Sequence, residues 1–283
     1  MFPTPIEKAS PLTQSTYKIA VPVVLILWLV PLFAVILTSA RSLDDILKGN
    51  FWGWPTEIMF FENFNAVFTT SPMWSYLWNT VLITIPTVIG VLITSSLAGF
   101  ALAKYRFRGN IAMFSIFIGG NFVPFQILMI PVRELTIQTG LYNTLTGLVI
   151  FHIAFQTGFC TLFLRNFIKS IPDSLMESAR IDGASEFQIY LQIIVPLVRP
   201  AMAALAVLEF TFIWNDYFWA LVLVQSDSVR PVTAGLNALR GQWITSWNLI
   251  SAGSIVAALP PVIMFFLMQK HFIAGLTLGA NKE

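Results

Sequence analysis

The chain has 283 residues, of which 56% are hydrophobic and only 11% are charged. A soluble domain carries about 25% charged residues, so this composition excludes a water-soluble globule and indicates an integral membrane protein. The net charge of +2 excludes the strong basic field that attracts nucleic acid. The single cysteine, Cys160, excludes an intramolecular disulfide and a zinc site built from cysteines.

Six apolar stretches are long enough to cross a membrane as helices, since about 20 residues span the roughly 30 Å hydrocarbon core. In chain order they cover residues 19–40, 76–103, 109–132, 142–164, 201–224 and 251–269. The first exceeds the apolar run of about 7–15 residues in a cleaved signal peptide, so we expect it to remain as an anchor. The sequence therefore predicts an all-α fold with six transmembrane helices.

Basic residues give the direction of these spans, because Lys and Arg are in excess in cytoplasmic segments. With the amino terminus inside, eleven basic residues fall in inner segments and five in outer segments. The outer five are Arg41, Lys48, Arg133, Arg230 and Arg240. We therefore expect both termini in the cytoplasm. This arrangement divides the chain into a cytoplasmic tail (1–18), a first span (19–40), a periplasmic loop (41–75), a core with the other five spans (76–270) and a second cytoplasmic tail (271–283).

The inner segment between the fourth and fifth expected spans, residues 165–200, is much longer than a turn and contains helix signals. Pro172 suits the first turn of a helix, where its missing N–H is not needed. Gly183 can take the left-handed conformation that ends a helix. Ser185 and Gln188 have the spacing of a capping box that opens another helix. The segment therefore predicts a helix, a glycine turn and a second helix at the inner face of the membrane.

These two short helices admit two interpretations. The apolar residues Leu175, Met176 and Ala179 are spaced along one face of the first helix. Such a face suits either a rigid knob that docks on a partner or an interfacial helix that rests on lipid headgroups, and spacing alone leaves both open. Pro196 and Pro200 predict a bend where the second helix enters the fifth span.

The same segment carries a motif. It contains Glu177-Ser178-Ala179, then the run RIDGAS, then a hydrophobic segment around Pro196. This pattern resembles the EAA loop of ABC-importer permeases, and the form RIDGAS is typical of their carbohydrate branch, the maltose-type permeases. Ser178 replaces the family's middle alanine, a small-for-small change. Shorter matches, over nearly the whole chain, are NF..VF at 63–68, NT at 79–80, YNT at 142–144, WND at 214–216 and HFIAGLTLGA at 271–280.

In permeases of this kind the loop forms coupling helices that sit in a cleft of a cytoplasmic ATPase, and the resemblance implies the same role here. It implies a polar contact with the ATPase for Glu177, close approach at Ala179 and the interhelical angle at Gly183. The full set of implied coupling residues is Glu177, Ser178, Ala179, Asp182, Gly183, Ala184 and Pro196. The implied partners are a second homologous permease, an ATPase dimer that holds ATP and Mg²⁺, an extracytoplasmic solute-binding protein and membrane lipid. No cofactor is expected in this chain itself.

Polar side chains inside the expected spans are candidates for a solute path, since such groups in a bilayer usually face a cavity or a partner. They are Asn121, Gln126, His152, Gln156, Glu209, Asn215 and Asp216. Glu209 and Asp216 are two helical turns apart, so we expect them to share a face of the fifth span. Amides and carboxylates suit sugar hydroxyls, but the same groups also form hydrogen bonds that simply join helices. Both interpretations stay open.

The sequence contains no P-loop, no HExxH zinc motif and no GxSxG nucleophile elbow, so an enzyme with its own active site or a metal site is not expected. Cys160 lies in an apolar span, where packing is a commoner role than reactivity. We predict a permease subunit of an ATP-driven importer, in the cytoplasmic membrane, for a sugar or sugar-like solute. The alternative is an ion-coupled secondary transporter with Glu209, Asp216 and His152 as its relay, although the internal repeats typical of that class are not evident.

Overall fold

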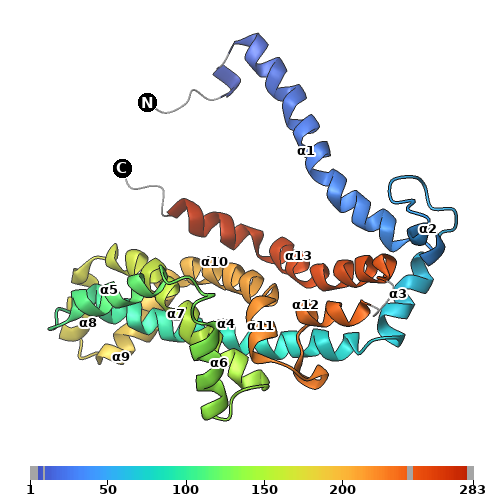
Figure 1. Ribbon diagram of the computed structural model, residues 1–283. Helices are drawn as coiled ribbons and strands as arrows, with labels where there is room; N and C mark the ends of the chain where they lie inside the picture. Colours follow the sequence, from blue (N-terminus) through green and yellow to red (C-terminus); the bar gives the residue numbers. More distant parts are fainter. Residues whose placement is uncertain (1–5, 9, 241–244, 279–283) are drawn as a thin grey trace. The chain divides into compact units, whose positions relative to one another are not determined.

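The computed structural model describes residues 6–8, 10–240 and 245–278, which are mostly helical (Figure 1). Within those ranges no strand forms, and the only β pairing is an isolated bridge between Arg240 and Thr245. For the described residues, the all-α prediction is confirmed. The chain divides into two compact units, Met1–Ser71 with Leu239–Val256 and Pro72–Ala238 with Ala257–Glu283.

The first unit contains η1 (Ile6–Lys8), α1 (Pro11–Ser39), α2 (Leu43–Leu47), α3 (Phe60–Thr69) and the first turns of α13 (Trp247–Leu278). α1 begins earlier than the predicted span 19–40 because Ser10 caps it. The Oγ of Ser10 accepts a hydrogen bond of 3.3 Å from the backbone N of Thr13.

Asn63 joins three segments of this first unit. Its Nδ2 donates to the carbonyl oxygens of Ser39, at 2.9 Å, and Arg41, at 2.8 Å. Its Oδ1 accepts from Nδ2 of Asn248 at 2.9 Å. Because both asparagines are buried, these bonds fix the start of the predicted periplasmic loop, 41–75, in one conformation.

The second unit holds the remaining helices. In chain order they are α4 (Met73–Lys104), α5 (Asn110–Gly120), α6 (Met129–Gln138), α7 (Leu145–Lys169), α8 (Asp173–Ile181), α9 (Glu186–Ile189), the π-helical turn η2 (Tyr190–Ile194), α10 (Val195–Trp214), α11 (Phe218–Leu223), η3 (Asp227–Val229), α12 (Val232–Gly235) and η4 (Leu236–Leu239), which ends at the boundary with the first unit.

α4 and α7 pack against each other along much of their length. Small residues permit this approach: a Cβ at Gly90 would collide with the side chain of Ile153, and one at Gly99 would lie 3.2 Å from the backbone N of Arg165. Close packing over small residues is typical of transmembrane helix pairs, which lack a hydrophobic driving force between them. The pair forms the frame on which the other elements of the second unit are placed.

Five helical stretches are long and apolar enough to cross a membrane. They are Pro11–Ser39, Met73–Lys104, Leu145–Lys169, Glu186–Trp214 and Trp247–Gln269. The first, second, third and fifth of these correspond to the first, second, fourth and sixth predicted spans, with shifted boundaries. The two other predicted spans differ from the structure.

The predicted third span, 109–132, is not one helix. α5 ends at Gly120 after 11 residues, or about 17 Å at 1.5 Å per residue, and the chain then forms turns as far as α6. Pro124 lies in these turns and has no N–H with which to continue a helical ladder. An average over an apolar window does not detect such a break, which explains the error.

The predicted fifth span, 201–224, is also wrong in its boundaries. α10 ends at Trp214, and Asp216 starts a new helix by accepting hydrogen bonds from the backbone N of Trp219, at 3.2 Å, and of Ala220, at 3.1 Å. The continuous helical stretch instead begins at Glu186, well before the predicted start.

The helical stretch continues through Pro196 and Pro200, the two positions at which the sequence predicted a bend. Pro196 lies in the first turn of α10, directly after the π-helical turn Tyr190–Ile194, and Pro200 lies inside α10. The predicted sixth span, 251–269, falls within α13. Of the two predicted tails, residues 1–5, 9 and 279–283 lie outside the described residues, as do the side chains of the motif at 271–280.

Candidate functional site

The predicted helix, glycine turn and helix are present as α8 and α9, at the end of the second unit where α4 finishes (Figure 1). Gly183 has a φ of +84°, in the left-handed region. Its N–H donates to the carbonyl of Arg180 at 3.0 Å, and the N–H of Ala184 donates to the carbonyl of Ala179 at 2.9 Å. These two bonds form the Schellman ending of a helix, so the glycine sets the angle between α8 and α9.

The capping box that opens α9 is confirmed as well. The backbone N of Gln188 donates to Oγ of Ser185 at 3.3 Å, and the backbone N of Ser185 donates to Oε1 of Gln188 at 2.8 Å. The two helices and their turn are therefore a locally determined structure, and we refer to residues 173–189 as the knob.

Ion pairs that the sequence did not predict fix the knob further. Arg180 donates to both carboxylate oxygens of Glu186, at 2.8 and 3.2 Å, and the hydroxyl of Tyr105 donates to the same carboxylate. Nζ of Lys104 lies 2.7 Å from Oδ1 of Asp173. These contacts tie α8 to α9 and tie both to the end of α4. In the sequence, the basic cluster beside Lys104 indicated only membrane orientation.

These contacts shift the pKa values of Asp173 and Tyr105. The hydrogen bond from Lys104, together with its positive charge, lowers the pKa of the Asp173 carboxyl. Burial, followed by the hydrogen bond to the Glu186 carboxylate, raises the pKa of the Tyr105 hydroxyl. Both shifts favour the state in which the contacts form, with a charged aspartate and a neutral tyrosine.

One face of the knob is anchored in the core of the second unit. Met176 is 2% exposed and belongs to a hydrophobic cluster with Ile168 of α7 and Ile194 of η2. Ala179 packs against the same cluster. The prediction that Leu175 shares this face is wrong, because its side chain is 45% exposed.

The outer face of the knob carries most of the residues implied in coupling. Glu177, Ser178, Asp182 and Gly183 are exposed. Of the other three, Ala179 and Ala184 are half-buried beneath them, and Pro196 is exposed on α10. Two large apolar side chains, Ile181 and Phe187, are also exposed on the knob. The surface therefore combines polar and apolar groups on a rigid base, as a docking surface requires.

A second group of candidate residues forms a buried polar row. His152, Gln156 and Cys160 lie one turn apart along α7, and all three are buried. Sγ of Cys160 donates to Oε1 of buried Glu209 on α10 at 3.1 Å. Nε2 of His152 lies 3.4 Å from Oδ2 of Asp216. We call these five residues the polar row.

The polar row connects α7 to α10 and to the start of α11. Glu209 and Asp216 do not share a helical face as predicted, because α10 ends between them; the chain break nevertheless brings Asp216 to His152. Cys160, which the sequence indicated only as packing, is a member through its bond to Glu209. Three buried atoms of the row have no hydrogen-bond partner among the described residues: Nδ1 of His152, Nε2 of Gln156 and Oε2 of Glu209.

The other three polar candidates lie apart from the row. Asn121 donates to the carbonyl of Phe117 at 2.6 Å and contacts α7 near Gly158. Asn215 donates to the carbonyl of Thr211 at 2.8 Å. Asn121, Gln126 and Asn215 are all exposed, so their amides are accessible where those of the row are not.

Comparison with known proteins identifies the family. Residues 73–277 match the model of the binding-protein-dependent transport system inner membrane component. The chain belongs to this family. It is 32% identical over 278 residues to the arabinooligosaccharides transport system permease protein AraQ of Halalkalibacterium halodurans, a match that covers 98% of this chain and 99% of that protein. It is 31% identical over 254 residues to the melibiose/raffinose/stachyose import permease protein MelC of Bacillus subtilis, covering 89% and 91%.

The fold of this family member is known from a solved relative. A chain from the crystal structure of a bacterial ABC transporter involved in the import of the acidic polysaccharide alginate matches with a TM-score of 0.79 and 24% identity, covering 93% of this chain and 99% of that one. From its family and its relatives, this chain is a multi-pass inner-membrane permease subunit of an ABC importer. ATP is hydrolysed in a separate subunit, and the matches give no support to the ion-coupled alternative.

Proposed function

We propose that this permease subunit carries a sugar or sugar-like solute, received from an extracytoplasmic binding protein, across the cytoplasmic membrane. The support comes from two relatives, a permease for transport of arabinooligosaccharides and a permease for import of melibiose, raffinose and stachyose. In the complete importer it pairs with a second homologous permease and a cytoplasmic ATPase dimer that binds ATP and Mg²⁺.

The knob is the part of the structure that supports the proposed contact with the ATPase. Its exposed face, with Glu177 and Gly183, contacts the ATPase, while its other face is anchored through Met176 in the core formed with α7 and η2. Because Arg180 and Glu186 tie the two short helices together, a push on the exposed face moves the knob as one body. Closure of the ATPase dimer is thereby transmitted to α4, α7 and α10.

The proposed topology has six crossings with both termini in the cytoplasm. α5, the turns around Pro124 and α6 together make the third crossing, in place of a single helix. A membrane-impermeant maleimide tests this topology. It should label a cysteine placed at exposed Glu57, in the outer loop, and not one placed at Asp182, on the knob, when added to intact cells; Cys160 is buried and contributes no background.

The solute path is proposed to involve both groups of polar residues. Asn121, Gln126 and Asn215 present exposed amides that suit sugar hydroxyls. The ring of Phe125 lies 5.0 Å from that of Phe218, so the turn segment that contains Asn121 and Gln126 contacts α11. The polar row, His152, Gln156, Cys160, Glu209 and Asp216, then holds α11 in position at the side of this path.

Uptake into proteoliposomes tests the function directly. Vesicles with the purified importer and enclosed MgATP are given the binding protein and radiolabelled raffinose or arabinotriose, with glutamine as the control solute. We expect uptake of a saccharide that requires both the binding protein and MgATP. Uptake driven by an imposed proton gradient without ATP would contradict the proposal and favour an ion-coupled carrier.

A further inference from the structure

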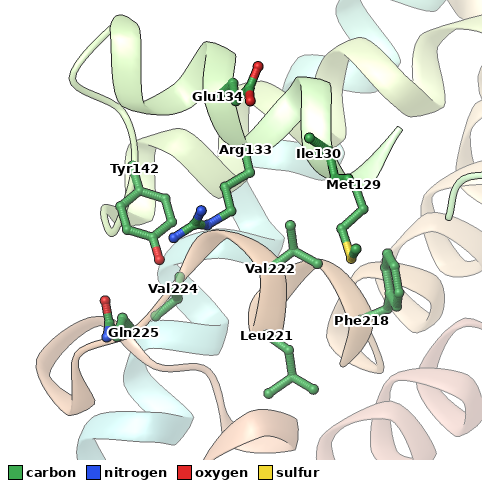
Figure 2. A pocket seen from close by; sticks show the side chains of 10 residues that line it. All are labelled: Met129, Ile130, Arg133, Glu134, Tyr142, Phe218, Leu221, Val222, Val224 and Gln225. Carbon is green, nitrogen blue, oxygen red and sulfur yellow. The ribbon is translucent and has the colours of Figure 1, made fainter. Parts of the chain in front are cut away.

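A pocket of about 630 Å³ lies between α6 and α11, apart from both the knob and the polar row (Figure 2). Its size falls within the range of small-molecule sites, about 300–1,000 Å³. Its lining includes the polar residues Arg133, Glu134, Tyr142 and Gln225 and the apolar residues Met129 and Phe218. By the proposed topology, the segments with Arg133 and Gln225 lie on the outer side of the membrane, so the pocket is at the outer mouth of the path.

Asn143 fixes the two walls of this pocket to each other. Its backbone N donates to the carbonyl of Leu223 at 2.8 Å, and its Oδ1 accepts from the backbone N of Gln225, at 2.8 Å, and of Ser226, at 2.9 Å. Asn143 has a φ of +59°, a left-handed conformation that asparagine tolerates better than most residues. The segment after α6 and the segment after α11 are thus held at a set distance.

The polar side chains around the pocket keep their hydrogen-bonding groups free. Among the described residues, the side chains of Arg133, Glu134, Tyr142 and Gln225 form no hydrogen bond or ion pair with the protein. Arg133 and Tyr142 do contact each other, because the guanidinium lies over the Tyr142 ring, 5.1 Å from its centre. Figure 2 shows the Arg133 side chain extended toward that ring. A guanidinium on an aromatic face keeps most of its donors free for a ligand.

Both walls supply apolar surface, Met129 from α6 and Phe218 and Val222 from α11. Phe218 and Met129 lie together at one end of the pocket, and Val222 lies between them and the polar end (Figure 2). A sugar ring has the matching character, since its C–H face packs on aromatic and apolar groups and its hydroxyls accept and donate hydrogen bonds. Arg133 and Glu134 bring opposite charges, so the pocket has no net charge with which to select an anion.

We propose that the pocket between α6 and α11 is a saccharide-binding site of this permease, suited to an uncharged sugar unit and occupied before the solute enters the membrane. This inference rests on the proposed sugar transport. Arg133 and Gln225 supply hydrogen bonds to hydroxyls, Tyr142 orients Arg133, and Phe218 stacks on the ring.

Transport kinetics of the complete importer test the site. Arg133→Gln and Gln225→Ala are compared with wild type and with Lys48→Gln, a control that removes an exposed charge from the outer loop. Raffinose and arabinotriose are the probes, with an alginate trisaccharide as the acidic comparison. We expect KM for the transported neutral saccharide to rise roughly three- to tenfold in each pocket variant, the loss of about one hydrogen bond, and to stay at the wild-type value in Lys48→Gln. Phe218→Leu, which keeps an apolar side chain, should raise KM while the importer still assembles.

The outcomes separate this inference from the proposed function. If wild type transports neither neutral saccharide, the proposed solute class fails and the site with it. If wild type transports one and KM stays within twofold in all pocket variants, only the site is overturned. If the variants instead weaken binding of the loaded binding protein to the importer, the pocket is a protein contact and the saccharide site is wrong. Preferential transport of the acidic trisaccharide would also overturn the uncharged specificity.

Discussion

Arg180 and Glu186 form a two-bond ion pair, at 2.8 and 3.2 Å, directly across the turn made by Gly183. The pair joins α8 to α9 across a turn whose shape the backbone of Gly183 already sets. The hydroxyl of Tyr105, directly after α4, donates to the same Glu186 carboxylate and so joins the pair to the end of α4. The knob is thus fixed both by local backbone signals and by charge pairing across the turn.

Removing this pair should weaken coupling more than stability. For Arg180→Gln we expect little change in the free energy of unfolding, because both side chains of the pair are partly exposed and exposed ion pairs contribute little to stability. The ratio of solute transported to ATP hydrolysed should fall, since the two short helices no longer move as one body. Arg199→Gln, a change of the same type at an exposed residue of α10, is the control. An unchanged ratio in Arg180→Gln would show that the backbone alone makes the knob rigid.

Gly183 should tolerate only residues that adopt a positive φ. Gly183→Ala places a Cβ in the left-handed conformation, at a cost of about 1–2 kcal/mol, and Gly183→Pro is incompatible with it. We expect uptake to fall in the alanine variant and to be abolished in the proline variant, with membrane insertion unaffected. Gly183→Asn, which adopts this conformation more readily, should retain more uptake than Gly183→Ala. Wild-type uptake in Gly183→Pro would exclude a coupling role for the turn.

The contact between Lys104 and Asp173 predicts a pH dependence. The pKa of Asp173 is below its ordinary value of 3.8, so its contribution to stability is present above the unfolded-state pKa and is lost as the pH falls through the lower folded-state pKa. Asp173→Asn should therefore lower the thermal midpoint of the purified importer at pH 7, and the difference from wild type should disappear as the pH falls below about 3.8. Asp182→Asn serves as the exposed carboxylate control. A difference that stays constant down to pH 3 would contradict this.

In the polar row, Cys160 should matter as a hydrogen-bond donor. Cys160→Ala leaves Glu209 without its side-chain donor in a buried site, and an unsatisfied buried polar group costs about 1–3 kcal/mol. We expect a lower thermal midpoint in Cys160→Ala and a smaller loss in Cys160→Ser, which keeps a donor. If the serine variant is as unstable as the alanine variant, the role of Cys160 is packing alone.

Asn143 gives a separate test of the pocket walls. Asn143→Gly keeps the backbone conformation, since glycine adopts a positive φ freely, and removes the side-chain bonds to Gln225 and Ser226. We expect a higher KM with normal assembly, because the two walls are no longer joined. A wild-type KM in a variant that assembles normally would show that the backbone bond to Leu223 is sufficient.

The sequence predicted those parts of the structure that depend on neighbouring residues. The Schellman turn at Gly183 and the capping box at Ser185 need only a few adjacent residues, and both are present. The interruptions after Gly120 and at Asp216 were missed, because hydropathy averages hide a proline turn or a carboxylate cap inside an apolar window. Contacts between distant segments, such as Cys160 with Glu209, have no signal in a single sequence.

The candidate functional residues divide in the same way, into those with a local sequence signal and those that depend on packing. Glu177 and Gly183 were recognisable from a motif, whereas Tyr105 and Glu186 act through a contact that only the packed structure brings together. The pocket around Arg133 combines α6, α11 and the segments that follow them, none of which carries a motif for binding. Its side chains become a site only when Asn143 joins the two segments.

Affinity purification of the tagged chain, expressed with its chromosomal neighbours and gently solubilised, tests most directly that the knob couples this permease to an ATPase. We expect an ATPase and a second permease to co-purify with the wild-type chain. The ATPase should be lost from Glu177→Lys and retained by Glu57→Lys, the same change at an exposed glutamate of the outer loop. A chain that purifies alone as a stable homo-oligomer, or a Glu177→Lys variant that keeps a fully active ATPase, would contradict the coupling role of the knob.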